Sequence, residues 1–142
     1  MTQRVRRGDV NQKEKANMTI PEDLKYTKDH EWIKVEGSKG TIGITDYAQG
    51  ELGDIIYLDI PTLGNVKQGD SFGTIEAVKT VADMNAPVSG KITEMNSAVN
   101  DNPASVNQDP YGAGWMAKIE LSNPSELDSL LTPAAYKELV GA

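Results

Sequence analysis

Hydrophobic and polar residues alternate in short runs along most of the chain, and this is the period of a half-buried β-strand. The first clear run extends from Trp32 to Val35 and ends at the turn residues Glu36 and Gly37. Similar turns containing glycine and proline separate the later runs, so the pattern predicts an antiparallel sandwich or barrel. The expected strands cover residues 32–35, 41–45, 55–60, 72–78, 81–86, 91–95 and 115–121.

Helical spacing replaces this alternation in three places. Thr45 suits an N-cap, which predicts a short helix over residues 46–52 that stops at Gly53. Near the end of the chain, apolar residues recur at helical spacing and follow prolines. Two short amphipathic helices are therefore expected over residues 125–131 and 134–140, packed against the sheet.

Composition excludes several kinds of site. The chain of 142 residues has no cysteine and one histidine, so disulfides, thiolate nucleophiles and Cys- or multi-His metal sites are excluded. The net charge of −7 and the low aromatic content of 6% argue against nucleic-acid binding. No apolar run reaches the roughly 18 residues that a membrane helix needs, so we expect no membrane association.

Charge is distributed unevenly. Residues 1–17 carry a net charge of +3, and residues 18–142 therefore carry −10. The first segment has too few apolar residues to offset its ordering entropy, which predicts a disordered leader: either added sequence or an extension upstream of a start at Met18. A nucleic-acid-binding arm is the alternative interpretation. Residues 18–142 are expected to form one domain.

Motifs for stand-alone catalysis are weak or absent. The chain has no P-loop and no G-x-S-x-G nucleophile elbow. The Asn-rich segment 96–109 is expected to be a loop, and its Asn-Asp-Asn run lacks the remaining residues of a calcium loop. His30 is a candidate general base, because Asp29 and Glu31 beside it would raise its pKa; a structural role is the alternative.

One lysine occupies a distinctive position. Lys79 lies between two strand-like stretches, and each stretch begins or ends at a glycine turn, Gly69 before it and Gly90 after it. The two arms have nearly equal length, which places Lys79 at the tip of a hairpin. From spacing alone, this lysine is either a solvated turn residue or a site of covalent modification.

The sequence around this lysine resembles the lipoylation segment of the glycine cleavage system H protein family. The resemblance rests on EAVK at residues 76–79 and DMNAPVSG at residues 83–90. Further segments of the family follow in the expected order: HEW, GITDYAQ, LGDI, DPY and GW, beginning at residues 30, 43, 52, 109 and 114. Together these segments cover nearly all of residues 18–142. Ala77 and the pair after Lys79 depart slightly from the family pattern.

The resemblance implies a mainly β, barrel-sandwich hybrid fold with short flanking α-helices. It implies a carrier and not an enzyme, with lipoic acid attached covalently to Lys79 within a recognition segment that includes Glu76 and Val78. The implied partners are a pyridoxal-phosphate-dependent glycine decarboxylase, an aminomethyltransferase, a dihydrolipoamide dehydrogenase, and a lipoate ligase or octanoyltransferase. The arm would carry an aminomethyl group from the first of these to the second, and the third would reoxidise its dithiol.

The resemblance also implies a cleft that shelters the loaded arm. Glu31 aligns with the residue that faces the aminomethyl group, and Asp83 is expected beside it. We expect a monomer that works in the bacterial cytoplasm, or in the mitochondrial matrix if the source is eukaryotic.

Other classes of protein remain as alternatives. An H-like protein that relays lipoyl groups to other proteins would keep the same lysine. A biotin carrier would have methionine on both sides of the lysine, and a 2-oxoacid dehydrogenase lipoyl domain commonly reads Asp-Lys-Ala; Val78 and Thr80 fit neither. A hydrolase or other stand-alone enzyme is disfavoured by the absent motifs.

Overall fold

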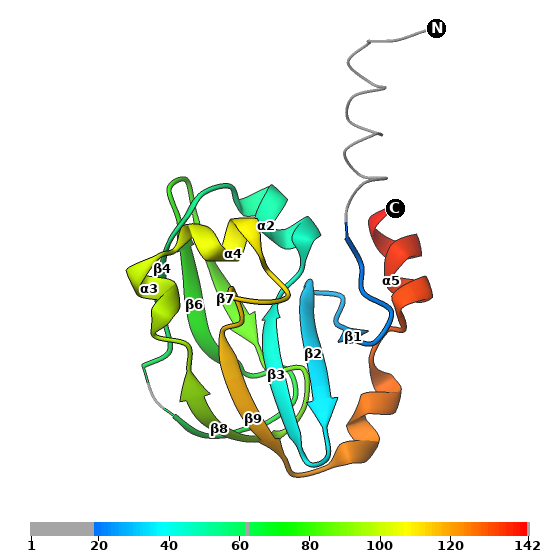
Figure 1. The fold of residues 1–142 in the computed structure, drawn as a ribbon. Coiled ribbons are helices and arrows are strands. Elements are labelled where there is room, and N and C mark those ends of the chain that lie inside the picture. Colours follow the sequence, from blue (N-terminus) through cyan, green and yellow to red (C-terminus); the bar gives the residue numbers. More distant parts are fainter. Residues whose placement is uncertain (1–18, 62, 142) are drawn as a thin grey trace, which may run out of the picture.

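The computed structural model describes residues 19–61 and 63–141. The leader predicted for residues 1–17 lies outside this part of the chain. The described residues form two antiparallel sheets with short helices at their margins (Figure 1), which confirms the mainly β prediction. None of the described helices is long and apolar enough to cross a membrane.

The larger sheet has six strands in the order β1-β2-β3-β9-β8-β5. All of its pairings are antiparallel. Its strands are β1 (Lys25–Tyr26), β2 (Glu31–Glu36), β3 (Lys39–Ile44), β5 (Gly64–Val66), β8 (Gly90–Met95) and β9 (Ala117–Leu121). The runs expected at residues 32–35, 41–45, 91–95 and 115–121 are confirmed as β2, β3, β8 and β9, with shifts of a residue or two at their ends.

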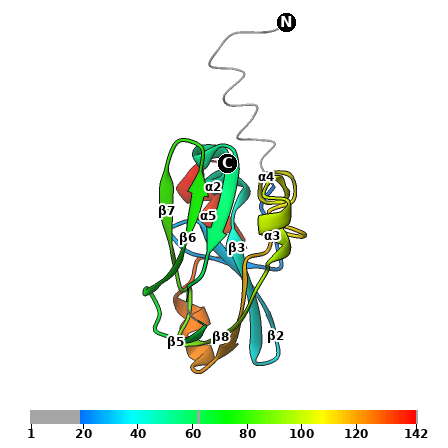
Figure 2. The ribbon, with the colours of Figure 1, turned by 90° about the vertical axis from the view of Figure 1, so that its left-hand side faces the viewer.

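The smaller sheet has the order β4-β6-β7 and is also antiparallel. Its strands are β4 (Ile55–Asp59), β6 (Ser71–Ala77) and β7 (Val81–Asn85), which confirms the three runs expected there. Apolar side chains from both sheets form the main core, including Ile42, Leu58, Ile75, Met84 and Ile119. In Figure 2 the β6–β7 hairpin extends towards the upper end of the molecule.

The helices are only partly as expected. Helix α2 (Asp46–Leu52) has the predicted bounds, and the Thr45 side chain accepts a hydrogen bond from the backbone of Ala48. Helix α5 (Pro133–Val140) is capped by Thr132 and is also confirmed. The helix predicted over residues 125–131 is present as η1 (Pro124–Ser129), but it is a 3-10 helix and ends two residues earlier than expected.

The prediction of a continuous loop over residues 96–109 is also wrong. Two short helices, α3 (Ala98–Asp101) and α4 (Ala104–Gln108), lie there on either side of Pro103. Each is about one turn long, which is too short for apolar periodicity to reveal it.

A second apolar cluster covers the outer side of the larger sheet near β2. The rings of Tyr26 and Tyr136 stack with centroids 4.6 Å apart, and Trp32 is buried with them. The Trp32 indole donates to the carbonyls of Ile44 and Pro110. Because this cluster lies on one face of β2 and the main core on the other, the first residues of β2 are buried on both faces.

Candidate functional site

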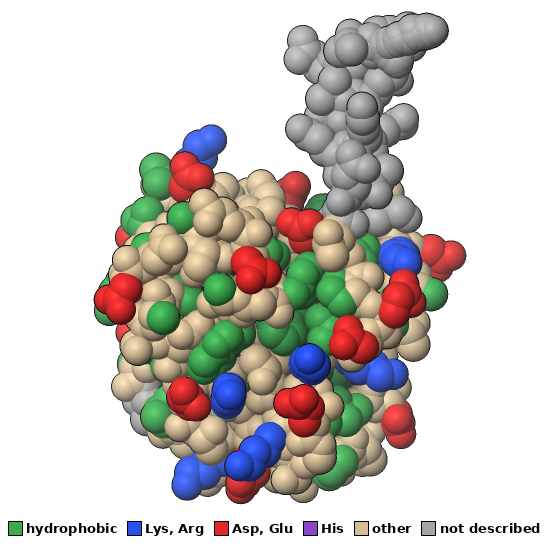
Figure 3. Space-filling model, in the orientation of Figure 1, with side chains coloured by type: hydrophobic (Ala, Val, Ile, Leu, Met, Phe, Trp, Pro, Cys, Tyr) green, Lys and Arg blue, Asp and Glu red, His purple; other side chains and the backbone are tan. Residues whose placement is uncertain are grey.

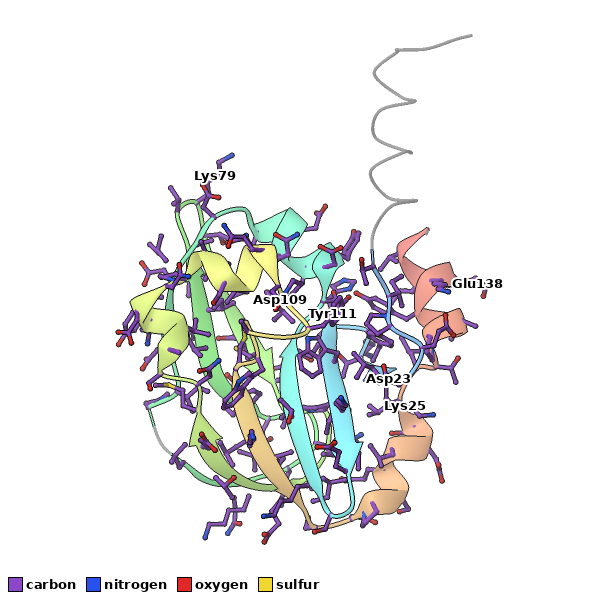
Figure 4. All side chains as sticks on the ribbon, viewed as in Figure 1. Asp23, Lys25, Lys79, Asp109, Tyr111 and Glu138 are labelled. Carbon is purple, nitrogen blue, oxygen red and sulfur yellow. The ribbon has the colours of Figure 1, made fainter. Side chains whose placement is uncertain are left out.

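Lys79 lies in the turn of the β6–β7 hairpin. The backbone N–H of Ala77 donates to the carbonyl of Thr80 at 2.7 Å, which closes the turn around Val78 and Lys79. The N–H of Val78 donates to the Asp54 carbonyl at 3.0 Å and ties the turn to the start of β4. The Lys79 side chain is exposed and points away from the body of the molecule (Figure 4). A reagent or enzyme can therefore reach its amine without opening the fold.

The outer face of the smaller sheet presents an apolar and acidic surface beside Lys79. Tyr57, Glu76 and Val81 are direct cross-strand neighbours on β4, β6 and β7, and all three are exposed. The next row towards the base of the hairpin is Asp59, Thr74 and Asp83. Val78 in the turn is 68% exposed. Exposed β-branched and aromatic side chains around one lysine favour a recognition surface.

Glu31, by contrast, is a buried carboxylate, with only 2% of the residue exposed. One of its oxygens accepts a hydrogen bond from the Thr27 hydroxyl at 2.7 Å. The other accepts from the backbone N–H of Asn85 at 2.9 Å, at the end of β7. The side chain therefore joins the start of β2 to the edge of the smaller sheet.

Burial controls the ionisation of this carboxyl. Loss of solvent raises the pKa of Glu31 to about 7, against the opposing effect of the hydrogen bonds from Asn85 and Thr27. The negative charge of Asp29 raises the pKa further. A carboxyl with a pKa near neutrality changes its charge in response to one nearby cation.

Glu31 lines a cleft of about 410 Å³. The walls come from the 27–31 turn, the end of β7, the Gly69 turn and the segment after η1. Asp83 is exposed on β7 and is not among the residues that line this cleft, so the structure does not bring it against Glu31. Lys79 lies roughly 20 Å along the hairpin from Asn85 at the usual rise of about 3.3 Å per residue. An arm on Lys79 would have to run along β7 to reach the cleft.

His30 has a structural environment. Its backbone has φ +73°, its Nδ1 lies 2.9 Å from the Tyr136 hydroxyl, and its ring packs on Tyr47. Burial is the larger effect on the pKa of His30 and lowers it, although Asp29 raises it as expected, so the net shift is downward and the expected raised pKa is wrong. The Tyr136 hydroxyl also contacts Thr45 Oγ1 at 2.7 Å. His30 and Thr45 therefore both help to hold α5, which carries Tyr136, against the sheet.

Sequence reasoning missed two residues that hold Glu31. Asn85 acts through its backbone, and its side chain donates to Asp29 at 3.3 Å. Thr27 lies four residues before Glu31, and no motif in the sequence indicated a hydrogen bond between the two side chains. In the described residues, no group of three or more His, Cys, Asp or Glu side chains is arranged to hold a metal ion.

Two facing antiparallel sheets with a lysine at the tip of an exposed hairpin define the lipoyl- and biotinyl-type class of carrier domain. The sequence model described as glycine cleavage H-protein matches residues 24–142. The chain belongs to the glycine cleavage H-protein family, the lipoyl carriers of the glycine cleavage system, and the resemblance in its motifs is thereby confirmed.

Relatives and a solved structure agree with this assignment. A glycine cleavage system H protein of Staphylococcus haemolyticus is 53% identical over 125 residues, covering 87% of this chain and 99% of that one. One from Carboxydothermus hydrogenoformans is 54% identical over 122 residues, covering 85% and 94%. A crystal structure of a glycine cleavage system H protein from Mycobacterium marinum superposes with a TM-score of 0.78 at 40% identity, covering 87% of this chain and 100% of that one. The barrel-sandwich hybrid prediction is confirmed by this neighbour.

Proposed function

We propose that Lys79 bears lipoic acid in amide linkage and that the resulting arm carries an aminomethyl group between enzymes. The exposed Lys79 amine at the hairpin tip is the observation that supports this most strongly. Amide formation removes the positive charge of the lysine. The dithiolane of the bound group supplies redox-active sulfurs, which this chain lacks because it contains no cysteine.

The hairpin fits this group for a physical reason. The turn is closed by one backbone bond and braced by another to Asp54, so its position is defined while the lysine side chain remains free. We assign Glu76 and Val78 to the surface that a lipoate ligase or octanoyltransferase recognises, since both are exposed beside Lys79. Tyr57 and Val81 extend that surface.

We assign Glu31 to the cleft that receives the loaded arm. A carboxylate there pairs with the cationic amine of the cargo, and the cleft excludes the water that would release it. Asp83 lies outside the cleft, on the strand that the arm would follow, so we assign it to guiding the amine along β7. Neither residue acts as a catalyst in this proposal: the protein holds the cargo and its partner enzymes transform it.

The partners in this proposal are the glycine decarboxylase, the aminomethyltransferase and the dihydrolipoamide dehydrogenase of the same system. Tethering the cargo keeps it at an effective concentration of about millimolar for each successive encounter. The similar H proteins come from bacteria, which supports a bacterial cytoplasmic location for this carrier.

Attachment at Lys79 is tested by the variant Lys79→Arg, which keeps the charge and removes the amine that is acylated. Intact mass after incubation with lipoate ligase, ATP and lipoate should show one lipoyl group on the wild type and none on the variant. Lys91→Arg, at an exposed position on β8, is the matched control and should accept lipoate normally. Lipoate on the Lys79→Arg chain would refute the assignment. Glycine–bicarbonate exchange with purified decarboxylase then separates a glycine carrier from a lipoyl relay, which would not support exchange.

The cleft assignment predicts faster loss of cargo from Glu31→Gln. A hydrogen bond to a charged group contributes about 1.5–3 kcal/mol, so release should rise by roughly one order of magnitude. Ammonia release from the loaded carrier without tetrahydrofolate is the measurement. Asp83→Asn should have a smaller effect, and the exposed Asp101→Asn on α3 should have none. Equal rates for Glu31→Gln and the wild type would leave Glu31 with a structural role only.

A further inference from the structure

The segment from Thr27 to Glu31 forms a closed turn. The N–H of Thr27 donates to the carbonyl of Glu31 at 2.9 Å, and the N–H of His30 donates to the carbonyl of Thr27 at 3.1 Å. His30 takes the left-handed conformation inside this turn, with φ +73°. A non-glycine residue there is uncommon and persists only where the surroundings fix it. The turn therefore has a defined shape that something must maintain.

The Thr27 hydroxyl has a complete set of hydrogen bonds. Its oxygen accepts from the backbone N–H of Asp29 at 3.2 Å and from that of Glu31 at 3.1 Å. A hydroxyl has two lone pairs and one proton, so these two bonds occupy its acceptor capacity. Its proton is left for the Glu31 carboxylate, 2.7 Å away. The neighbouring backbone thus fixes the hydroxyl as a donor to Glu31.

This donor has a counterpart across the cleft. The N–H of Asn85 holds the second Glu31 oxygen at 2.9 Å, so one donor from the turn and one from β7 hold the carboxylate between them. Each carboxylate oxygen has a further lone pair, and Glu31 lines the cleft. The remaining acceptor capacity is available to a cation that enters the cleft.

We propose that Thr27 is a positioning residue: its hydroxyl fixes the Glu31 carboxylate as an acceptor for the amine of the carried group. The inference rests on the proposed role of Glu31 in the loaded carrier. A hydroxyl donor stabilises the ionised carboxylate and disfavours the protonated one, so it opposes the effect of burial. Without Thr27, Glu31 would be protonated over more of the neutral pH range and would pair less well with an ammonium group.

Other charged and titratable groups around Glu31 do not replace this donor. Asp29 is on the same turn and its charge opposes ionisation of Glu31. Lys28 lines the cleft, yet no described hydrogen bond or ion pair joins it to Glu31. The hydroxyls of Tyr26 and Tyr136 are engaged elsewhere, with Pro21 and with His30 and Thr45.

The first test uses the apo protein and needs no activity. Thr27→Val removes the hydroxyl at nearly constant shape, while Thr27→Ser keeps it. Carboxyl-carbon NMR should show the Glu31 titration moved upward by roughly one pH unit or more in Thr27→Val and unchanged in Thr27→Ser. Thr93→Val, an exposed threonine on β8, is the control. An unchanged Glu31 titration in Thr27→Val would overturn the proposal and leave Thr27 as a turn cap.

The second test uses the loaded carrier. Ammonia release should be several-fold faster in Thr27→Val than in the wild type near pH 7, with Thr27→Ser restoring slow release. The difference should shrink above pH 9, where Glu31 is ionised in both proteins. Near-UV circular dichroism confirms folding, and if Thr27→Val unfolds, Thr27→Ala, which admits water, takes its place with the same expected direction.

The two tests separate this inference from the function on which it depends. If Glu31→Gln releases ammonia as slowly as the wild type, the proposed role of Glu31 fails, while a shifted titration in Thr27→Val still supports the hydroxyl donor. If Glu31→Gln is fast but Thr27→Val titrates and releases like the wild type, the carrier function stands and Thr27 is not a positioning residue.

Discussion

Lys79 and Glu31 occupy opposite environments although both are assigned to one arm. Lys79 is solvated at a hairpin tip, so its amine has no burial cost and is open to a modifying enzyme. Glu31 is buried on a strand that is covered on both faces, and within the described part of the chain two donors compensate the lost water. Burying a carboxylate with so few partners costs stability, which suggests that the site is retained for binding.

The raised pKa of Glu31 predicts a pH-dependent cost to folding. The folded protein holds this proton up to about pH 7, whereas the unfolded chain releases it near 4.5. Between these values the folded state binds more protons, so the free energy of unfolding falls as pH rises and then levels off above pH 7. At about 1.4 kcal/mol per tenfold change in proton affinity, the loss is at most about 3–4 kcal/mol.

Glu31→Gln should remove this slope. Urea unfolding at pH 4.5, 6 and 8 should show the variant gaining stability relative to the wild type as pH rises. The exposed Glu94→Gln on β8 controls for removal of one carboxylate. A difference between Glu31→Gln and the wild type that stays constant across this range would show that folding does not raise the pKa of Glu31.

Residue positions were predictable where local turns determine them. Lys79 is at the hairpin tip because glycine turns bound two arms of similar length, and that pattern is visible in the sequence. The burial of Glu31 was not visible, because it depends on the end of β7 and on the segments around Gly69 and Leu130, which are distant in the sequence. The burial of His30 against Tyr47 and Tyr136 was likewise not visible, and it reversed the expected direction for the pKa of His30.

At the scale of elements, both edges of the smaller sheet are protected by side chains. The Asn100 amide accepts from the N–H of Leu58 at 2.8 Å and donates to its carbonyl at 2.9 Å, as a neighbouring strand would. Asn107 accepts from the N–H of Ile55 in the same way. At the other edge, Glu31 occupies the N–H of Asn85. Unprotected edges invite pairing with other chains, so α3 and α4 protect β4.

The length of each element and the distance to its partners explain which elements could be predicted from the sequence. Strands with buried faces alternate clearly and were found, whereas β1 and β5 have two and three residues and were missed. The asparagines that hold β4 made residues 96–109 look like a loop, because asparagine is typical of turns. Their partners lie about forty to fifty residues away in the sequence, beyond the reach of local patterns.

At the scale of the molecule, charge is mixed on one face and acidic overall. The face of the molecule seen in Figure 3 carries lysine or arginine and acidic side chains side by side. Lys39, Lys118, Glu94 and Glu120 lie together around one hollow of the larger sheet. The outer face of the smaller sheet instead combines apolar residues with Glu76, Asp83 and Asp59. An acidic rim around Lys79 would steer the arm towards basic active-site entrances, an effect that weakens with added salt.

The described fold is anchored from Thr19 onward. The N–H of Thr19 donates to Asp46 at 3.0 Å, its carbonyl accepts from the Tyr111 hydroxyl at 2.7 Å, and Ile20 is buried in the second apolar cluster. Removing residues 1–17 leaves all of these contacts in place and changes the net charge from −7 to −10.

A chain that starts at Met18 should therefore unfold at the same temperature as the full chain and accept lipoate at the same rate. Differential scanning calorimetry and intact mass over time measure the two. Deletion up to Ile20 is the informative comparison: it removes the Thr19 hydrogen bonds and a buried side chain, at a cost of about 1.5–3 kcal/mol for the side chain alone. For a domain of this size, each kcal/mol lowers the melting temperature by roughly 2–4 °C or somewhat more. A loss of several degrees already on removal of residues 1–17 would show that this segment docks on the fold and that the domain begins before Met18.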